Sequence, residues 1–277
     1  MDESEQFLGY AKDGDLSKVK VMVEKMKVDV CCTVLHTEGD TALHRAAKYG
    51  QMHVCEYLLS RGSPLDVENE LGEQPLHKAA EGGNLTVIDL FLKHGAQINA
   101  QGRHNFTPLN VAVMYKQTAA VKRLVEAGAR VNINDCHSYE SPLHHAVDSA
   151  DASIEIVQTL LNADADVNVQ ESDYDNTPAH WAAQSGNIQC LELLHSAGAK
   201  FDVVNIEGHT VAQAACAASE FETAKRVDTL SVHPLALKDL CRLAIRRYLT
   251  SSRMICRLDV PSELLEFLQF IEPVNSH

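Results

Sequence analysis

Four histidines recur at one place in a repeated pattern and are the first candidates for chemistry: His44, His77, His144 and His180. An imidazole can act as a general base when a nucleophile or a bound metal stands beside it. The sequence contains no G-x-S-x-G, C-x-x-C or H-E-x-x-H motif that would supply such a partner. Gly82-Gly83 is not followed by Lys-Ser/Thr, so it predicts the end of a helix rather than a phosphate-binding loop. These patterns predict a non-catalytic protein.

Cysteine is the second candidate, because Cys31-Cys32 and His36 could supply metal ligands. A structural zinc site needs four ligands, and no further C-x-x-C or H-x-x-x-H pair completes the set. We therefore expect no metal and no cofactor. The eight cysteines are scattered along the chain. Since no secretory signal precedes them, we expect a reducing compartment and free thiols rather than disulfides.

The composition limits the classes of partner. The 277 residues include 24 basic and 38 acidic ones, which gives a formal charge of −14. Nucleic acids and anionic membranes are bound mainly through Lys and Arg, so neither is an expected partner. The start M-D-E-S-E-Q lacks a basic region, and no long apolar run predicts a membrane span. We expect a cytoplasmic protein, with access to the nucleus left open.

A tetrapeptide recurs six times and determines the predicted architecture. Its copies begin at Thr41, Gln74, Thr107, Ser141, Thr177 and Thr210, with spacings of 33, 33, 34, 36 and 33 residues. Thr or Ser can cap a helix, and Pro at the next position fits the first helical turn. A second stretch then has apolar residues three and four apart, as in Val87, Leu90 and Phe91. The sequence therefore predicts an all-α stack of short helix pairs.

The tetrapeptide resembles the T-P-L-H-x-A signature of ankyrin repeats, and the resemblance covers about residues 31–230. Residues 1–30 resemble a degenerate leading repeat that caps the solenoid. The resemblance implies that the four histidines are structural hydrogen-bonding groups and that the stack binds a protein along its surface. Asp166-Val167-Asn168 is similar to the sequence around hydroxylated asparagines of ankyrin proteins; a turn-stabilising Asn168 is the alternative.

Three consecutive turns depart from the repeat. The glycine found two residues before the helix start elsewhere is replaced by Asn105, Tyr139 and Asp175. Tyrosine tolerates a positive φ poorly, so we expect a changed backbone in the turn at Tyr139. Aromatic and polar residues in these turns could anchor a substrate protein: Arg103, His104, Phe106, His137, Tyr139, Asp173 and Tyr174. Ordinary drift in tolerant loops is an equal alternative.

The last segment differs from the repeats in charge and in pattern. His233–His277 contains six basic and five acidic residues, so the excess of acidic residues lies before it. Apolar residues from Leu237 to Leu249 at offsets 0, 3, 4, 7, 8, 11 and 12 predict an amphipathic helix. Such a helix is not stable alone, so it must pack on its own chain or on another protein.

Ala236–Arg246 resembles the elongin-binding box of the SOCS box, with the core L-x-x-L-C-R-x-x-I-R. Leu258–Pro261 resembles the cullin box, with Asp259 in place of the family's proline. The resemblance implies elongin C-binding by Leu237, Leu240, Cys241, Arg242 and Ile245, and cullin-binding by Leu258, Val260, Pro261, Leu264 and Phe267.

Ankyrin repeats followed by this box are similar to the ankyrin repeat and SOCS box family. The resemblance implies a capping repeat at 1–30, ankyrin repeats at 31–230, a three-helix SOCS box at 231–272 and a tail at 273–277. It implies a substrate receptor that recruits elongin C with elongin B, cullin-5 and its RING subunit, and leads an unidentified substrate to ubiquitination and degradation. The alternative is an ankyrin scaffold or inhibitor whose C-terminal helices cap the solenoid.

Overall fold

The computed structural model describes residues 3–33, 38–148 and 152–232. The chain divides into two compact units, Met1–Pro234 and Leu235–His277, and the elements below belong to the first. The described helices are α1 Glu3–Asp13, α2 Leu16–Glu24, α3 Ala42–Lys48, α4 Met52–Ser60, α5 Pro75–Glu81, α6 Leu85–Lys93, η2 Arg103–Asn105, α7 Pro108–Met114, α8 Thr118–Glu126, α9 Pro142–Val147, α10 Ile154–Asn162, α11 Pro178–Gln184, α12 Ile188–Ser196, α13 Val211–Ala217 and α14 Phe221–Val232.

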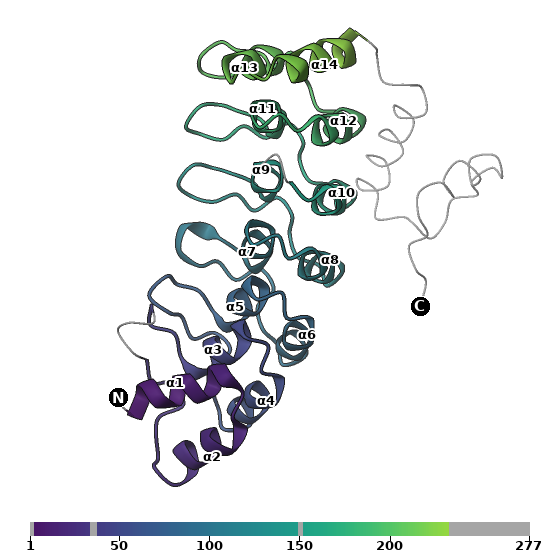
Figure 1. Cartoon of the computed structure of the whole chain (residues 1–277). Helices are drawn as coiled ribbons and strands as arrows, with labels where there is room; N and C mark the ends of the chain where they lie inside the picture. The colour runs from purple at the N-terminus through teal and green to yellow at the C-terminus, as the bar shows by residue number, and fades with distance from the viewer. Residues whose placement is uncertain (1–2, 34–37, 149–151, 233–277) are drawn as a thin grey trace, which may run out of the picture. The chain divides into compact units, whose positions relative to one another are not determined.

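The α-helices form antiparallel pairs that stack in chain order, so the unit has two parallel rows of helices (Figure 1). The first helices of the pairs contact one another from α1 and α3 through to α11 and α13. The second helices form the other row, from α2 and α4 through to α12 and α14. Long turns project from the first row, and we call the segments 94–107, 127–141 and 163–177 the three central fingers.

Local capping explains why each first helix begins where the tetrapeptide begins. Thr41, Gln74, Thr107, Ser141, Thr177 and Thr210 are the N-cap residues, and each forms a reciprocal capping box with the residue three positions later. Proline occupies the first helical position in α5, α7, α9 and α11, where its missing N–H leaves no bond unmade.

One continuous core runs between the two rows. The leucine of the tetrapeptide is fully buried in α3, α5, α7 and α9, as Leu43, Leu76, Leu109 and Leu143. Paired alanines such as Ala79-Ala80 are also fully buried, and their small size lets neighbouring helices approach closely. The leading pair α1 and α2 joins this core through Phe7, Leu8, Val19 and Met22.

The all-α ankyrin fold predicted from the repeat is confirmed: every regular element within the described ranges is a helix. The last second helix, α14, spans Phe221–Val232. The three-helix arrangement predicted for residues 231–272 falls almost entirely outside the described residues. Among the described helices, none combines the length and the apolar character that a bilayer crossing needs.

Candidate functional site

The four recurrent histidines tie each repeat to the next one. In His44, Nδ1 accepts the backbone N–H of Thr41 at 3.1 Å, so Nε2 carries the proton and donates to the carbonyl of Glu73 at 2.9 Å. His144 repeats this with Ser141 N–H at 3.0 Å and Asn176 O at 3.1 Å. Matching bonds join His77 to the carbonyl of Phe106 and His180 to that of His209. The predicted structural role of these imidazoles is confirmed.

Burial keeps these imidazoles neutral. Desolvation lowers the pKa of His144 to about 4, against the weaker opposing effect of its bond to Asn176. The pKa values of His44, His77 and His180 are lowered for the same reason. A neutral ring is required here, because Nδ1 must accept a hydrogen bond.

The central fingers lie side by side because their backbones are hydrogen-bonded to one another. Cys136 N–H donates to His104 O at 3.0 Å, and Ser172 N–H donates to Ser138 O at 2.7 Å. Arg103 N–H donates to Leu71 O at 2.8 Å and continues the series towards the preceding turn. The seven residues predicted to hold a substrate therefore project from three adjacent, mutually bonded turns.

The turn at Tyr139 is one residue longer than an ordinary turn, because Asp135 N–H donates to Glu140 O where Asn69 N–H donates to Glu73 O, but the positive φ is retained. Asn105, Tyr139 and Asp175 have φ values of 64°, 58° and 55°, close to the 67° of Gly72 in an ordinary turn. The reason lies four residues earlier, where the buried carboxylate of Asp135 accepts four backbone N–H groups, from His137, Ser138, Tyr139 and Glu140, at 2.7–3.2 Å. These bonds hold the turn in the left-handed conformation despite the tyrosine side chain.

Glu171 has the same function in the next finger. Its buried carboxylate accepts the N–H groups of Asp173, Tyr174 and Asn176 at 2.6–3.2 Å. In an ordinary turn, Asn69 takes this place and accepts two N–H groups, from Leu71 and Glu73. In both fingers that are longer by one residue, an acidic side chain, Asp135 or Glu171, replaces the asparagine of the ordinary turn. Aligning the turns of the sequence would have shown this replacement.

Exposure divides the seven predicted substrate-binding residues. Tyr139 and Tyr174 are 56% and 57% exposed. Arg103, His104, His137 and Asp173 are also exposed. Phe106 departs from the expectation of an exposed anchor: it is half-buried, its ring centroid lies 5.8 Å from that of His145, and its carbonyl is bonded to His77.

Sequence reasoning missed a row of rings at the base of the fingers. His145 follows His144 on α9, and its ring lies between those of Phe106 and Trp181, at centroid distances of 5.8 Å and 6.4 Å. Trp181 also contacts His144 edge-on at a centroid distance of 5.2 Å, so its ring packs against the preceding repeat. The ring row Phe106, His145 and Trp181 runs from the finger 94–107 across α9 to α11.

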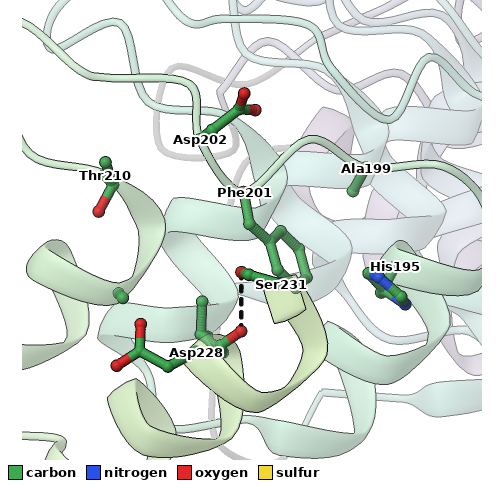
Figure 2. A pocket seen from close by; sticks show the side chains of 9 residues that line it. His195, Ala199, Phe201, Asp202, Thr210, Asp228 and Ser231 are labelled. Atoms are coloured by element: carbon green, nitrogen blue, oxygen red, sulfur yellow. Dashed lines mark hydrogen bonds between the residues drawn. The ribbon is translucent and has the colours of Figure 1, made fainter. Parts of the chain in front are cut away.

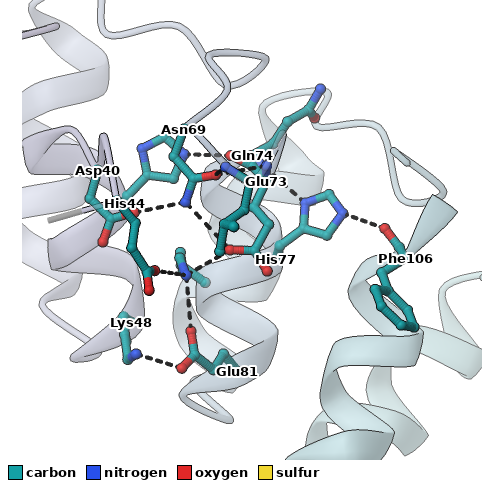
Figure 3. Close-up of polar contacts among 12 residues, drawn as sticks. Asp40, His44, Lys48, Asn69, Glu73, Gln74, His77, Glu81 and Phe106 are labelled. Carbon is teal, nitrogen blue, oxygen red and sulfur yellow. Dashed lines mark hydrogen bonds and ion pairs between the residues drawn. The ribbon is translucent and has the colours of Figure 1, made fainter. Parts of the chain in front are cut away.

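A charged cluster occupies the corresponding place on α3 and α5 (Figure 3). The side chain of Lys78 is 5% exposed, and its Nζ lies 2.6 Å from Glu73 and 3.4 Å from Glu81. Lys48 reaches Glu81 at 2.5 Å. Burial alone would lower the pKa of Lys78, but the hydrogen bond and charge of Glu73 raise it above its usual value. Lys78 is therefore a charged residue inside a matched set of carboxylates.

A hollow of about 420 Å³ opens near α14, lined by residues that include His195, Phe201, Thr210, Asp228 and Ser231 (Figure 2). The Ser231 hydroxyl donates to the carbonyl of Val227 at 2.8 Å, so it is held in place rather than presented for reaction. The arrangement is that of a surface recess between helices.

Asn168 contributes to the packing of repeats. Its Oδ1 accepts Lys200 N–H at 2.8 Å and its Nδ2 donates to Gly198 O at 3.3 Å. Asn132 makes the matching bonds to Asp166 and Asp164 one repeat earlier. These contacts favour the turn-stabilising role of Asn168.

The ten residues predicted to bind elongin C and cullin lie beyond the part of the chain that the structure describes. Within the described part, one set of three side chains could hold a metal ion: Asp135, Glu140 and His145.

Comparison with known proteins bears on both parts of the chain. Models of ankyrin repeats match residues 8–102, 55–135, 143–195 and 179–226, and the SOCS box model matches residues 233–269. Protein fem-1 homolog C of Mus musculus is 32% identical over 139 residues, which are 46% of this chain and 21% of that protein. Ankyrin repeat and SOCS box protein 5 of Homo sapiens is 35% identical over 113 residues, 40% of this chain and 33% of that protein.

The chain thus matches between about a fifth and a third of the length of these relatives. Among solved structures, the human ASB11 ankyrin repeat domain superposes with a TM-score of 0.67 at 22% identity, over 80% of this chain and 96% of that one. This likeness concerns the fold. Because ankyrin models cover more than half of the residues and a SOCS box follows them, the chain belongs to the ankyrin repeat and SOCS box protein family.

Proposed function

We propose that this protein is the substrate receptor of a cullin-RING ubiquitin ligase. The observation that carries the proposal is the order of the two modules: ankyrin matches end at residue 226 and the SOCS box match begins at residue 233. The stack would hold a substrate protein while the box recruits the ligase. The receptor would act by raising the effective concentration of the substrate near the ubiquitin-loaded enzyme, with no chemistry on its own side chains. Its site of action would be the cytoplasm, with access to the nucleus.

The proposed ligase contacts lie in the SOCS box. Leu237, Leu240, Cys241, Arg242 and Ile245 would bind elongin C, which enters with elongin B; Leu258, Val260, Pro261, Leu264 and Phe267 would bind cullin-5, which enters with its RING subunit. An apolar stripe of this kind needs a partner surface to be stable. Buried apolar anchors at such an interface each contribute about 2 kcal/mol or more.

Co-purification of elongins B and C with the full chain tests the proposal. We expect the wild type to retain both and the double variant Leu237→Pro, Cys241→Phe to lose them. Lys238→Ala, which changes a residue off the predicted stripe, is the matched control and should retain both elongins. If the double variant retains them, the assignment is wrong and the C-terminal segment acts as a cap on an ankyrin scaffold.

We propose the central fingers as the substrate-binding surface. Tyr139 and Tyr174 are exposed aromatic side chains on adjacent fingers, the type of residue that anchors protein interfaces. Phe106 is a poor test position, because its ring packs against His145. Tyr139→Asn together with Tyr174→Ala removes both rings, and Asn accepts the left-handed φ of position 139.

Substrate capture with the proteasome inhibited distinguishes this surface from loop drift. We expect the double tyrosine variant to lose proteins that the wild type captures, while elongin binding is unchanged. Tyr49→Ala removes a tyrosine that is 42% exposed outside the fingers and should leave capture intact. A chain ending at Val232, the last residue of α14, should capture substrates without elongins. Unchanged capture by the double variant would place the substrate elsewhere.

A further inference from the structure

Asp135, Glu140 and His145 bring three potential metal-ligating side chains together at the junction of the finger 127–141 and α9. Their ligand atoms all lie within 4.8 Å of one another. The Nε2 atom of His145 lies 3.5 Å from a carboxylate oxygen of Glu140. Successive members of this set are five positions apart in the sequence. This spacing matches no helical or hairpin metal motif, so the tertiary fold brings the three side chains together.

The imidazole of His145 has an unsatisfied nitrogen inside the protein. Its side chain is 11% exposed, and Nε2 is buried with no hydrogen-bond partner. An unpaired buried polar atom destabilises a fold by about 1–3 kcal/mol unless a ligand or water satisfies it. In a neutral imidazole one ring nitrogen carries the proton and the other offers a lone pair, so Nε2 of His145 can serve as a metal ligand.

The carboxylates also retain capacity for a ligand. Asp135 Oδ1 accepts three N–H groups, but Oδ2 accepts one, from Glu140 at 3.2 Å, and keeps a lone pair. Asp135 and Glu140 bring two carboxylates together here, with their ligand atoms within 4.8 Å of each other. In the cluster around Lys78, by contrast, an ammonium group compensates the carboxylates. At Glu140 a cation would supply the missing compensation.

We propose that Asp135, Glu140 and His145 bind a divalent transition-metal ion, best matched by Zn²⁺. One imidazole and two carboxylates are ligands that zinc accepts. Zinc bonds of about 2.0–2.1 Å in tetrahedral geometry separate neighbouring ligand atoms by about 3.4 Å, which agrees with the 3.5 Å between His145 and Glu140. Three protein ligands leave a fourth position for water or for a side chain of a bound protein.

The ion would also strengthen the neighbouring turn. Asp135 holds the backbone of the finger that carries Tyr139, and His145 contacts the rings of Phe106 and Trp181. A metal shared by Asp135 and His145 would link this finger to α9 directly. The inference does not depend on ligase function, because it concerns the ankyrin unit alone.

Titration of metal-free, full-length protein with ZnCl₂ in a calorimeter tests the proposal. We expect one zinc ion per chain, with binding weakened at least about tenfold in Glu140→Gln and in His145→Gln. Glu140 is partly exposed, so Glu140→Gln should remain folded, and circular dichroism checks both variants. Zinc should raise the melting temperature of the wild type and leave that of Glu140→Gln unchanged.

Two controls test other side chains that could bind zinc. His53 and Glu56 form an exposed pair with the same side-chain types, 3.6 Å apart, so His53→Ala should bind zinc as the wild type does. Cys136 is exposed beside Asp135, and Cys136→Ser should also bind normally. The proposal is overturned if the wild type binds no zinc at about 100 µM, if Glu140→Gln and His145→Gln bind normally, or if Cys136→Ser alone abolishes binding.

Discussion

The first and second halves of the ankyrin stack differ at one position of the repeat, the residue that follows the structural histidine or its replacement. In α3 and α5 this residue is Arg45 or Lys78, and its side chain is paired with carboxylates. In α9 and α11 it is His145 or Trp181, and these two side chains contact each other through their rings. Caps and histidines keep the scaffold constant, so this position can change its chemistry without changing the fold. Arg45 Nε and His145 Nε2 are each buried without a hydrogen-bond partner, so the halves differ in two other respects: Lys78 is paired with Glu73 and Glu81 in the charged half, and the ring half carries the exposed Tyr139 and Tyr174.

Removing the charge of Lys78 should give the largest effect. Lys78→Met keeps most of the volume but leaves Glu73 and Glu81 buried without their cation, which we expect to lower the free energy of unfolding by about 3 kcal/mol or more. Urea denaturation measures it. Lys122→Met breaks an ion pair between half-exposed side chains and should change stability by at most about 1 kcal/mol. Equal losses of unfolding free energy in the two variants would show that burial does not strengthen the ion pairs of Lys78.

Acid should destabilise the stack through its histidines. Their folded pKa values lie below the unfolded value, so the unfolded chain binds protons first and stability falls as the pH drops from about 6.5 towards 4. His144 alone accounts for up to about 3 kcal/mol of this loss. His144→Asn, which copies Asn110 of the preceding repeat, should flatten the pH dependence of unfolding between pH 7 and 5. An unchanged slope would contradict the assignment to His144.

Removing the carboxylate of Glu171 should destabilise the ring half moderately. Glu171→Ala leaves the N–H groups of Asp173, Tyr174 and Asn176 without their acceptor, and we expect a loss of about 2 kcal/mol. Glu171→Gln keeps one oxygen acceptor and should lose less. Hydrogen exchange of these amides measures the effect locally; equal protection in Glu171→Ala and the wild type would count against it.

A change of the backbone preference at Tyr139 should have the smallest effect on stability, and it should stabilise the protein. Tyr139→Gly relieves a left-handed residue that carries a Cβ, which we expect to stabilise the protein by about 0.5–1 kcal/mol. The mirror change, Gly72→Ala, adds a Cβ 3.0 Å from Arg103 N and should destabilise it. Thermal denaturation compares the two; a loss of stability in Tyr139→Gly would mean that the ring itself contributes packing.

The repeat made most of the fold predictable. The tetrapeptide encodes the caps and the 3–4 spacing encodes the second helices, so both are local signals. The Lys78 cluster was not predictable, because its partner Glu38 comes from another repeat and the pairing depends on the stacking register. The positive φ of Tyr139 was not foreseen, because the preference of a single residue was considered without the Asp135 carboxylate that outweighs it.

The candidate surface was predictable in part. The irregular turns identified the fingers, and six of their seven residues are exposed. The seventh, Phe106, is held by His145, a contact between residues 39 positions apart in the sequence that no local pattern reveals. The SOCS box residues were derived from resemblance and stay predictions.

The series of structural histidines that joins successive repeats is interrupted once, in α7. Asn110 replaces histidine in α7 and reaches Ile133 O at 3.4 Å, whereas the longer His77 ring also reaches the carbonyl just before the next helix. The contact between α7 and α9 therefore lacks the histidine hydrogen bond that joins the neighbouring repeats, although the bond from Cys136 N–H to His104 O still crosses it. Under mechanical tension, the stack should open first between α7 and α9, and the contact between the rings of Phe106 and His145 would be lost in the same step.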